Sequence, residues 1–130
     1  MCIRDSAMTV SSVFSVSLEP MSMAVSVNKN ASLHSLVDVG RKFSLNLLTA
    51  SQIDIAEICS GAEEGKIRFE HPDWDFSEIP FLKNAQSNLF CTCKKIVPLY
   101  SHSLVIGEVD RVVHSGKMNP LIYQDGRYES

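Results

Sequence analysis

The feature that most constrains the fold of this chain is a period-two alternation of apolar and polar residues that recurs along most of its length. Successive side chains of a β-strand point to opposite faces, so this pattern is typical of strands that bury one face. The runs that read as strands are residues 9–18, 21–28, 41–48, 85–99, 102–115 and 120–128. They follow one another without a regular strand–helix–strand order, which predicts a mainly β protein built as an antiparallel barrel of about six strands.

Three stretches between these runs have a different pattern. A short helix is predicted after residue 30, with Asn30 or Ser32 as its N-cap and Gly40 at its end. Residues 49–61 place apolar side chains at helical spacing and stop at a glycine, which predicts a second helix. Residues 62–80 are polar, contain two prolines and have no steady period, so we expect a long loop there.

Charge and composition exclude several classes of protein. The net charge of −3 provides no general attraction to nucleic acid or to an anionic membrane, so any anion site must be local. No apolar run approaches the roughly 18 residues of a membrane-spanning helix. The sequence also lacks the glycine pattern of a Rossmann fold and the lysine motif of a P-loop.

The cysteine pattern points to a cytoplasmic protein without a metal site. None of the cysteines has a zinc-binding spacing, and we expect all of them to be reduced thiols in the core. They are Cys2, Cys59, Cys91 and Cys93. Cys91 and Cys93 lie two residues apart in a predicted strand, so both should face the same side.

The first residues differ in character from the rest of the chain. The stretch MCIRDS has no apolar signal-peptide core and resembles a translated sequencing-adapter fragment. We therefore expect residues 1–7 to be a non-native leader and the domain itself to span residues 8–130.

Six short motifs stand in an order that resembles the flavin reductase family, which includes the reductase component of 4-hydroxyphenylacetate monooxygenase. They are MTVSSVFSVSLEP, VSVNKNASLHSLV, FSLNLLTASQ, KIRFEHPDW, HSLVIGEV and PLIYQDGRY. No single motif is diagnostic, but together they extend from Met8 to Tyr128. The resemblance implies an FMN-binding split β-barrel with two or three short helices, usually a homodimer. Family members carry a helix and a strand before the position of Met8, so we expect the first strand to be missing here.

The resemblance also implies an activity. Such proteins reduce FMN or FAD with NADH or NADPH, by hydride transfer from C4 of the nicotinamide to N5 of the flavin, and supply reduced flavin to a separate monooxygenase component. The protein positions the two rings, and no acid or base is needed for that step. Two alternatives stay open at this point. One is a flavoprotein with tightly bound FMN that acts as an electron carrier or oxidase, and the other is a non-enzymatic protein that binds flavin or haem.

The small side chains of the first run indicate where a flavin ring would lie. Slim residues let main-chain N–H groups approach the polar edge of the ring, and hydrogen bonds there tune its reduction. The resemblance places the stretch that matches residues 8–12 along this ring. The candidate contacts are Thr9, Val10, Ser11, Ser12 and Ser17. The alternative interpretation is an ordinary half-exposed strand.

Two further stretches are candidates for the flavin phosphate. Asn28, Lys29 and Ser32 surround the predicted start of the first helix, where a lysine, a hydroxyl and free N–H groups would bind an anion. Simple helix capping is the structural alternative. In the long loop, the resemblance aligns Arg68 and Phe69 with a basic–aromatic pair whose cation reaches the phosphate.

Three single residues complete the predicted site. Asn46 matches a family asparagine that either bonds the flavin or braces the neighbouring loop. His102 is the one catalytic candidate, as a contact to the nicotinamide or the flavin. It stands where the family has Gly-Asp-His, and the sequence here is Tyr100-Ser101-His102. Tyr123, in the last run, is a candidate nicotinamide contact.

Overall fold

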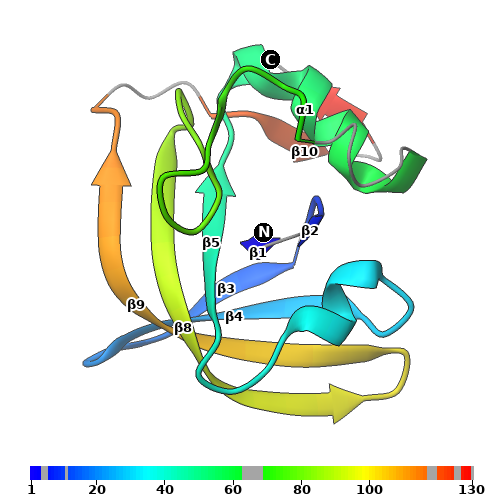
Figure 1. Cartoon of the computed structure of the whole chain (residues 1–130), viewed down its shortest axis with the longest axis vertical. Helices are drawn as coiled ribbons and strands as arrows, with labels where there is room; N and C mark the ends of the chain where they lie inside the picture. Colours follow the sequence, from blue (N-terminus) through cyan, green and yellow to red (C-terminus); the bar gives the residue numbers. More distant parts are fainter. Residues whose placement is uncertain (4–5, 11, 63–68, 117–119, 125–126, 130) are drawn as a thin grey trace.

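The computed structural model describes residues 1–130 except 4–5, 11, 63–68, 117–119, 125–126 and 130 (Figure 1). Its main element is a seven-stranded antiparallel sheet with the strand order β2-β1-β5-β8-β9-β4-β3. The strands are β1 (Cys2–Ile3), β2 (Ser6–Ala7), β3 (Val13–Leu18), β4 (Met21–Asn28), β5 (Lys42–Leu47), β8 (Ser87–Leu99) and β9 (His102–His114). The predicted fold class is therefore confirmed.

The sheet curls around the main apolar core, and a second apolar cluster that includes Ile55 and Trp74 lies beside it. The longest strands, β8 and β9, have 13 residues each and bend sharply in Figure 1. Their register shifts twice, between Phe90 and Cys91 and between Cys93 and Lys95, and such bulges bend a strand. The buried side chains of this core include Val25, Val27, Phe43, Leu45, Cys91, Cys93 and Val105. The two cysteines of β8 thus face the core together, as the sequence predicts.

Four short helical elements cover the sheet. They are η1 (Ser32–Leu36), η2 (Ala50–Gln52), α1 (Ile53–Glu57) and η3 (Ile58–Ala62), of which the last three follow one another without a break. The second predicted helix is therefore confirmed, and its predicted start carries a capping box between Thr49 and Gln52. The predicted cap of the first helix is wrong. The N-cap of η1 is Ala31 rather than Asn30 or Ser32, and no side chain caps this helix. None of the helices in the described residues has the length and apolar character needed to cross a bilayer.

The smaller strands differ from the predicted pattern. The predicted loop contains a two-stranded hairpin of β6 (Trp74–Asp75) and β7 (Phe81–Leu82). The last predicted run, residues 120–128, contains the Asp-Gly pair typical of a hairpin turn, and it holds two paired strands rather than one, β10 (Ile122–Gln124) and β11 (Arg127–Glu129). The strand predicted for residues 9–18 begins only at Val13. Residues 9, 10 and 12 lie outside any strand, although the Ser26 N–H donates to the Ser12 carbonyl oxygen over 3.1 Å.

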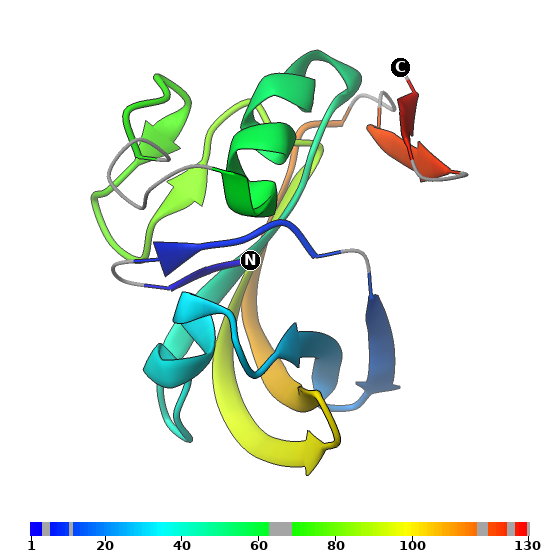
Figure 2. The ribbon, with the colours of Figure 1, turned by 90° about the vertical axis from the view of Figure 1, so that its right-hand side faces the viewer.

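The N-terminal residues belong to the folded unit. Met1, Cys2 and Ile3 are buried, and β1 pairs with both β2 and β5, with Cys2 opposite Ser44. Figure 2 shows this short hairpin passing close to the helical segment that contains α1. The sheet therefore ends at β2 on one side and at β3 on the other. The non-native origin of this segment and the missing first strand stay predictions.

Candidate functional site

A cavity of about 620 Å³ lies between the N-terminal segment, strand β5, helix α1 and the C-terminal residues. Its walls are mostly apolar and include Met8, Val10, Leu45, Ile55, Trp74 and Leu121. Thr9 and Asn46 are among its few polar members. An apolar cavity of this size with a small number of polar groups is typical of a small-molecule site. Three of the predicted flavin-binding residues, Thr9, Val10 and Asn46, thus meet in one cavity.

Thr9 fastens the segment before β3 to the helical layer. Its N–H donates to the Cys59 carbonyl oxygen over 3.1 Å, and its Oγ1 donates to the Ala56 carbonyl oxygen over 2.6 Å. Both donors of Thr9 are therefore used within the protein. The neighbouring Val10 packs against the main apolar core. While these two bonds are present, any contact of this segment with a flavin ring must involve groups other than the N–H and Oγ1–H of Thr9.

Asn46 makes the contacts of a bracing residue, which is one of the two roles that the sequence analysis predicts for it. Its Nδ2 donates to Cys2 Sγ over 3.3 Å and to Ser44 Oγ over 3.1 Å. Its Oδ1 accepts from the Leu82 N–H over 3.1 Å and from Asn88 Nδ2 over 2.6 Å. Two donor and two acceptor contacts fill the capacity of an amide side chain. Asn46 therefore ties β1, β5, β7 and β8 together at the cavity wall, and its contact with flavin stays a prediction.

A second, polar group of predicted residues lies where β4 ends and β9 begins. Asn28 and His102 are direct partners in the register of these strands. The Lys29 N–H donates to the Ser101 carbonyl oxygen over 2.9 Å, and the Asn28 Oδ1 accepts from the Asn30 N–H over 2.8 Å. The structure thus places the catalytic candidate His102 beside two residues predicted to hold the phosphate.

Ser32 is close to this polar group, but its expected helix is short. Its Oγ lies 3.5 Å from Ser6 Oγ at the start of η1, which has five residues. So short a 3₁₀ turn contributes little dipole. The phosphate prediction at Asn28, Lys29 and Ser32 therefore depends on their side chains.

The other predicted residues lie apart or outside the described residues. Ser17 is exposed and pairs with Ser22, at the end of β4 opposite to Asn28. Phe69 packs against Trp74, with ring centroids 4.9 Å apart, and so supports a wall of the cavity. Ser11, Arg68 and the side chain of Tyr123 lie outside the described residues.

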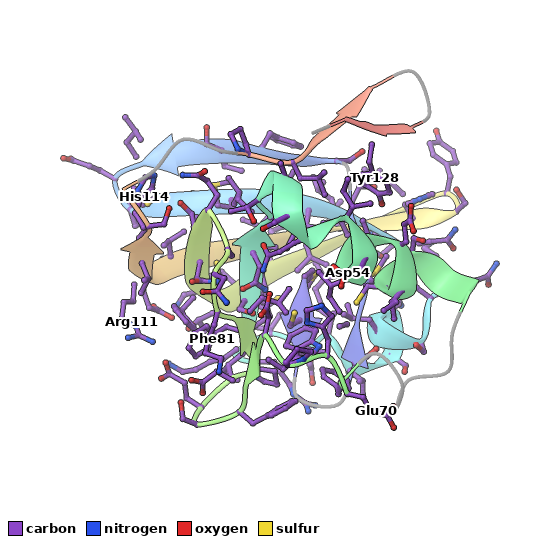
Figure 3. All side chains as sticks on the ribbon, turned by 90° about the horizontal axis from the view of Figure 1, so that it is seen from above. Asp54, Glu70, Phe81, Arg111, His114 and Tyr128 are labelled. Atoms are coloured by element: carbon purple, nitrogen blue, oxygen red, sulfur yellow. The ribbon has the colours of Figure 1, made fainter. Side chains whose placement is uncertain are left out.

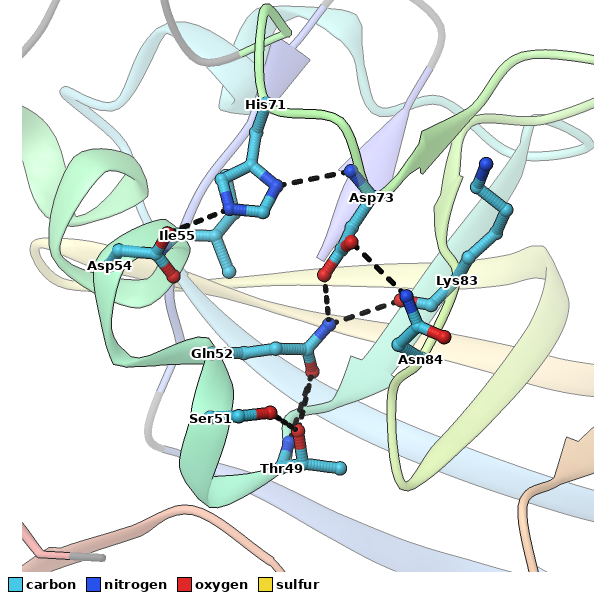
Figure 4. Close-up of polar contacts among 9 residues, drawn as sticks. All are labelled: Thr49, Ser51, Gln52, Asp54, Ile55, His71, Asp73, Lys83 and Asn84. Carbon is cyan, nitrogen blue, oxygen red and sulfur yellow. Dashed lines mark hydrogen bonds and ion pairs between the residues drawn. The ribbon is translucent and has the colours of Figure 1, made fainter.

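A polar network that the sequence analysis missed joins the 69–84 segment to the helical layer (Figure 4). The Gln52 side chain is buried, and its Nε2 donates to Asp73 Oδ2 over 3.0 Å and to the Lys83 carbonyl oxygen over 3.1 Å. Its Oε1 accepts from the Thr49 N–H over 3.0 Å. The Thr-x-x-Gln spacing of the capping box was the signal available in the sequence for this role.

His71 adds a second connection between this segment and α1. Its Nδ1 accepts from the Asp73 N–H over 3.1 Å, so Nε2 carries the proton and donates to Asp54 Oδ2 over 2.8 Å. Partial burial raises the pKa of Asp54, but the bonds from His71 and from the Ile55 N–H outweigh it, and the pKa lies below its usual value. The network holds in place the chain that carries Trp74.

Another set of contacts fastens the same segment to the sheet. The Arg111 guanidinium pairs with the Glu78 carboxylate and lies over the Phe90 ring, 4.2 Å from its centroid. The Phe90 ring also packs edge-on against Phe81 at 5.3 Å. In Figure 3, Arg111 and Phe81 lie on the same side of the molecule, away from Asp54 on α1. The segment is therefore anchored at two separate places.

The cysteines are free, buried thiols, as the sequence predicts. Burial raises the pKa of Cys91 to about 12, with a further contribution from the Asp110 charge. Burial also raises the pKa of Cys2. Such thiols are protonated at neutral pH and are poor nucleophiles. Within the described part of the chain, no cluster of three or more histidine, cysteine or acidic side chains could hold a metal ion.

Comparisons with known proteins give a consistent result. Residues 3–130 match the family model described as "Flavin reductase like domain". The chain is 32% identical over 127 residues to the reductase component of an FADH(2)-dependent resorcinol hydroxylase from Rhizobium sp. (strain MTP-10005), with 96% of this chain and 71% of the relative covered. It is 34% identical over 121 residues to a flavin reductase (NADPH) from Lentzea aerocolonigenes, with 89% and 68% covered.

Solved structures show the same similarity. An NADH:FAD oxidoreductase from Streptomyces globisporus, solved with NAD and FAD fragments, has a TM-score of 0.85 and 25% identity, and 95% of this chain and 75% of that chain are covered. The flavin reductase of styrene monooxygenase from Pseudomonas putida S12 has a TM-score of 0.80 and 27% identity, with 94% and 78% covered.

Proposed function

The chain belongs to the flavin reductase family, and we propose that it reduces FMN or FAD with NADH or NADPH and supplies the reduced flavin to a separate oxygenase component. The observation that carries the proposal is the family match over residues 3–130. Bound together, the two nucleotides would supply the redox chemistry, which is a hydride transfer from C4 of the nicotinamide to N5 of the flavin. The protein's own contribution is to hold and orient the two ligands and to limit the access of water.

The residues present fit an aromatic ring system at the cavity. Its apolar walls provide the dispersion contacts that a flat heterocycle needs, and Thr9 and Asn46 are held rigidly by their own hydrogen bonds. The anchored Trp74 belongs to the same wall. We propose that Val10 and its neighbours in the segment before β3 lie along the ring.

The residues present also fit the phosphate of a flavin nucleotide. Lys29 lies directly after β4 and is exposed, and its amine forms no ion pair with any described residue. In a chain with a net charge of −3, a cationic amine in this position suits an anion. We propose that Asn28, Lys29 and Ser32 contribute to the phosphate site.

A direct spectrophotometric assay tests the proposed flavin reductase activity. Purified protein is mixed with FMN and either NADH or NADPH, and the loss of the nicotinamide absorbance band is followed. We expect the protein to oxidise many equivalents of one nucleotide and to turn over added FMN. Oxidation limited to the amount of bound flavin would instead indicate a tight flavoprotein. Flavin binding without oxidation of either nucleotide would refute the enzymatic function.

We further propose that the protein is a homodimer that pairs through β3. This strand ends the sheet, and its apolar side chains Phe14, Val16 and Leu18 are exposed. An exposed apolar edge strand favours association unless something covers it. We propose that a second copy of the chain covers this edge, because flavin reductases of this family are usually homodimers.

Replacing Leu18 by lysine tests this arrangement. Leu18 is 78% exposed, so the substitution should leave the fold intact while it places a charge in the interface. We expect the molar mass from light scattering to fall from dimer to monomer. The matched control is Val39→Lys, at a position that is 61% exposed and lies outside β3, and it should leave the mass unchanged. An unchanged dimer in the Leu18 variant would contradict the proposed interface.

A cytoplasmic location fits these features. All four cysteines are free and buried, which suits a reducing compartment. We propose the cytoplasm as the location of the protein, where nicotinamide nucleotides are also available.

A further inference from the structure

We propose that Tyr128 is an aromatic contact of the flavin ring at the open side of the cavity, and that the base of the C-terminal hairpin holds Tyr128 in position. The proposal rests on the proposed function, because it takes the ring of a flavin as the occupant of the cavity. It adds the last strand of the chain to a ring site whose other walls include the segment before β3, β5 and the helical layer.

The first argument is where the cavity opens. The lining residues of β1 and α1 are closed off from solvent, since Cys2, Ile55 and Ala56 are each at most 2% exposed. Most of the exposed or half-buried lining residues belong instead to the segment before β3, to the end of β5 and to the C-terminal residues, where Leu121 and Tyr128 are half-buried. A ring that enters the cavity therefore comes within reach of the C-terminal hairpin.

The second argument is which aromatic side chain a ligand can reach. Among the described residues that line the cavity, the aromatic ones are Trp74 and Tyr128. Trp74 is 6% exposed, and its ring packs against Phe69 and Phe76, with centroid distances of 4.9 and 6.2 Å. Tyr128 is half-buried and thus leaves more of its ring open. Aromatic rings pair favourably in offset or edge-on geometry, so Tyr128 is the better contact for a flat heterocycle.

The third argument is the way in which the hairpin is attached. The Leu121 N–H donates to the Leu48 carbonyl oxygen over 2.8 Å, and Pro120 forms an isolated β-bridge with Thr49. Strand β10 begins directly after Leu121 and pairs with β11, which carries Tyr128. The contacts at the base therefore set where Tyr128 lies. A two-stranded hairpin is only marginally stable by itself, so a ligand packed on Tyr128 should also stabilise the bond at the base.

The fourth argument concerns the polar residues of the cavity wall. Both donors of Thr9 bond to carbonyl oxygens of the protein, and the amide of Asn46 makes four contacts within the protein. While these bonds are present, the affinity for a ring depends mainly on packing. An aromatic side chain contributes a large contact area, so the loss of Tyr128 should be measurable.

Binding measurements with riboflavin and with FMN test this contact. Affinities are measured from the quenching of flavin fluorescence, so the readout needs no turnover. We expect Tyr128→Ala to weaken the binding of both flavins about tenfold, because it removes an aromatic pair together with its buried area. Tyr128→Phe keeps the ring and should stay within about threefold of the wild-type affinities.

Tyr100→Ala is the matched control, because it removes a tyrosine that is 94% exposed and does not line the cavity. It should leave both affinities unchanged. Hydrogen exchange at the Leu121 amide, measured by NMR, reports the position of the hairpin base. Riboflavin should slow this exchange about tenfold in the wild-type protein and less than about twofold in Tyr128→Ala.

Unchanged riboflavin affinity in Tyr128→Ala would overturn the proposal, and turnover by the wild-type protein would then leave the proposed activity standing. A loss confined to FMN would place Tyr128 near the phosphate and overturn it too. So would a raised KM for the nicotinamide nucleotide with unchanged flavin affinities, or a wild-type protein that binds no riboflavin. If riboflavin binding depends on Tyr128 but neither nicotinamide nucleotide is oxidised, the proposed activity fails while this inference stands.

Discussion

Replacing Gly107 by alanine is expected to lower the free energy of unfolding by about 3 kcal/mol, the range of overpacking a tight core. A Cβ at this position would lie 2.5 Å from Phe43 Cζ and 3.0 Å from both Phe43 Cε1 and Cys91 Cβ. Phe43 has no exposed surface, so its ring has no free space into which to move. Thermal unfolding measures the effect, and we expect the midpoint to fall by roughly 10 °C.

Gly40→Ala is the matched control for this substitution. A Cβ at Gly40 would meet nothing within 4 Å, but the residue has a φ of +89°, so only backbone strain of about 1 kcal/mol is expected. Phe43→Leu should partly relieve the clash, so the Gly107→Ala, Phe43→Leu double variant should lose less stability than the sum of the two single changes. Equal losses for the Gly107 and Gly40 variants would contradict the close contact with Phe43.

The role of Gly107 also shows where sequence reasoning reached its limit. The alternation in residues 21–28 and in the two long runs predicted β4, β8 and β9 to within two residues, because one buried face leaves a period-two pattern. A glycine inside such a run gives no comparable signal. Its importance comes from Phe43, which is on another strand, and no local pattern relates the two positions.

The segment before β3 is a second example. Residues 9–12 alternate like the strand that follows them, yet both donors of Thr9 bond to carbonyl oxygens of the helical layer. These partners are about fifty residues away in the sequence, at Ala56 and Cys59. A long-range hydrogen bond can therefore override the local preference for a strand.

The candidate site was predictable in its residue types but not in its grouping. The family-like motifs identified Asn28 and His102 separately, and each was assigned to a different part of the ligand. Their adjacency depends on the pairing of β4 with β9, which joins strands more than seventy residues apart. Register between such distant strands is set by the whole sheet, so it became visible only in the structure.

Replacing Gln52 by glutamate should cost about 3–5 kcal/mol of stability at neutral pH, as expected for an uncompensated buried charge. Gln52 is 2% exposed, and its Nε2 donates to Asp73 and to the Lys83 carbonyl group. The substitution keeps the shape of the side chain and its acceptor for the Thr49 N–H. It replaces the donor with a carboxylate oxygen that faces one carboxylate and one carbonyl oxygen, both of which repel it.

The loss should depend on pH in a defined direction. Burial and the Asp73 charge raise the pKa of the introduced carboxyl group in the folded state above its unfolded value of about 4.3. A group with a raised pKa contributes fully to stability below the unfolded pKa, and this contribution is lost as the pH rises through the folded pKa. The difference in stability from the wild-type protein should therefore shrink as the pH falls from 7 toward about 4.

Urea unfolding of both proteins at several pH values between these limits measures the difference. The matched control is Gln52→Met, which removes the same donor without adding a charge and should cost about 1–3 kcal/mol with a weaker dependence on pH. Because Gln52 and Asp73 hold the segment that carries Trp74, the glutamate variant should also expose Trp74 and shift its fluorescence to longer wavelengths at neutral pH. Equal losses in the two variants, without a pH dependence or a fluorescence shift in either, would mean that the Gln52 amide does not hold this segment against the helical layer.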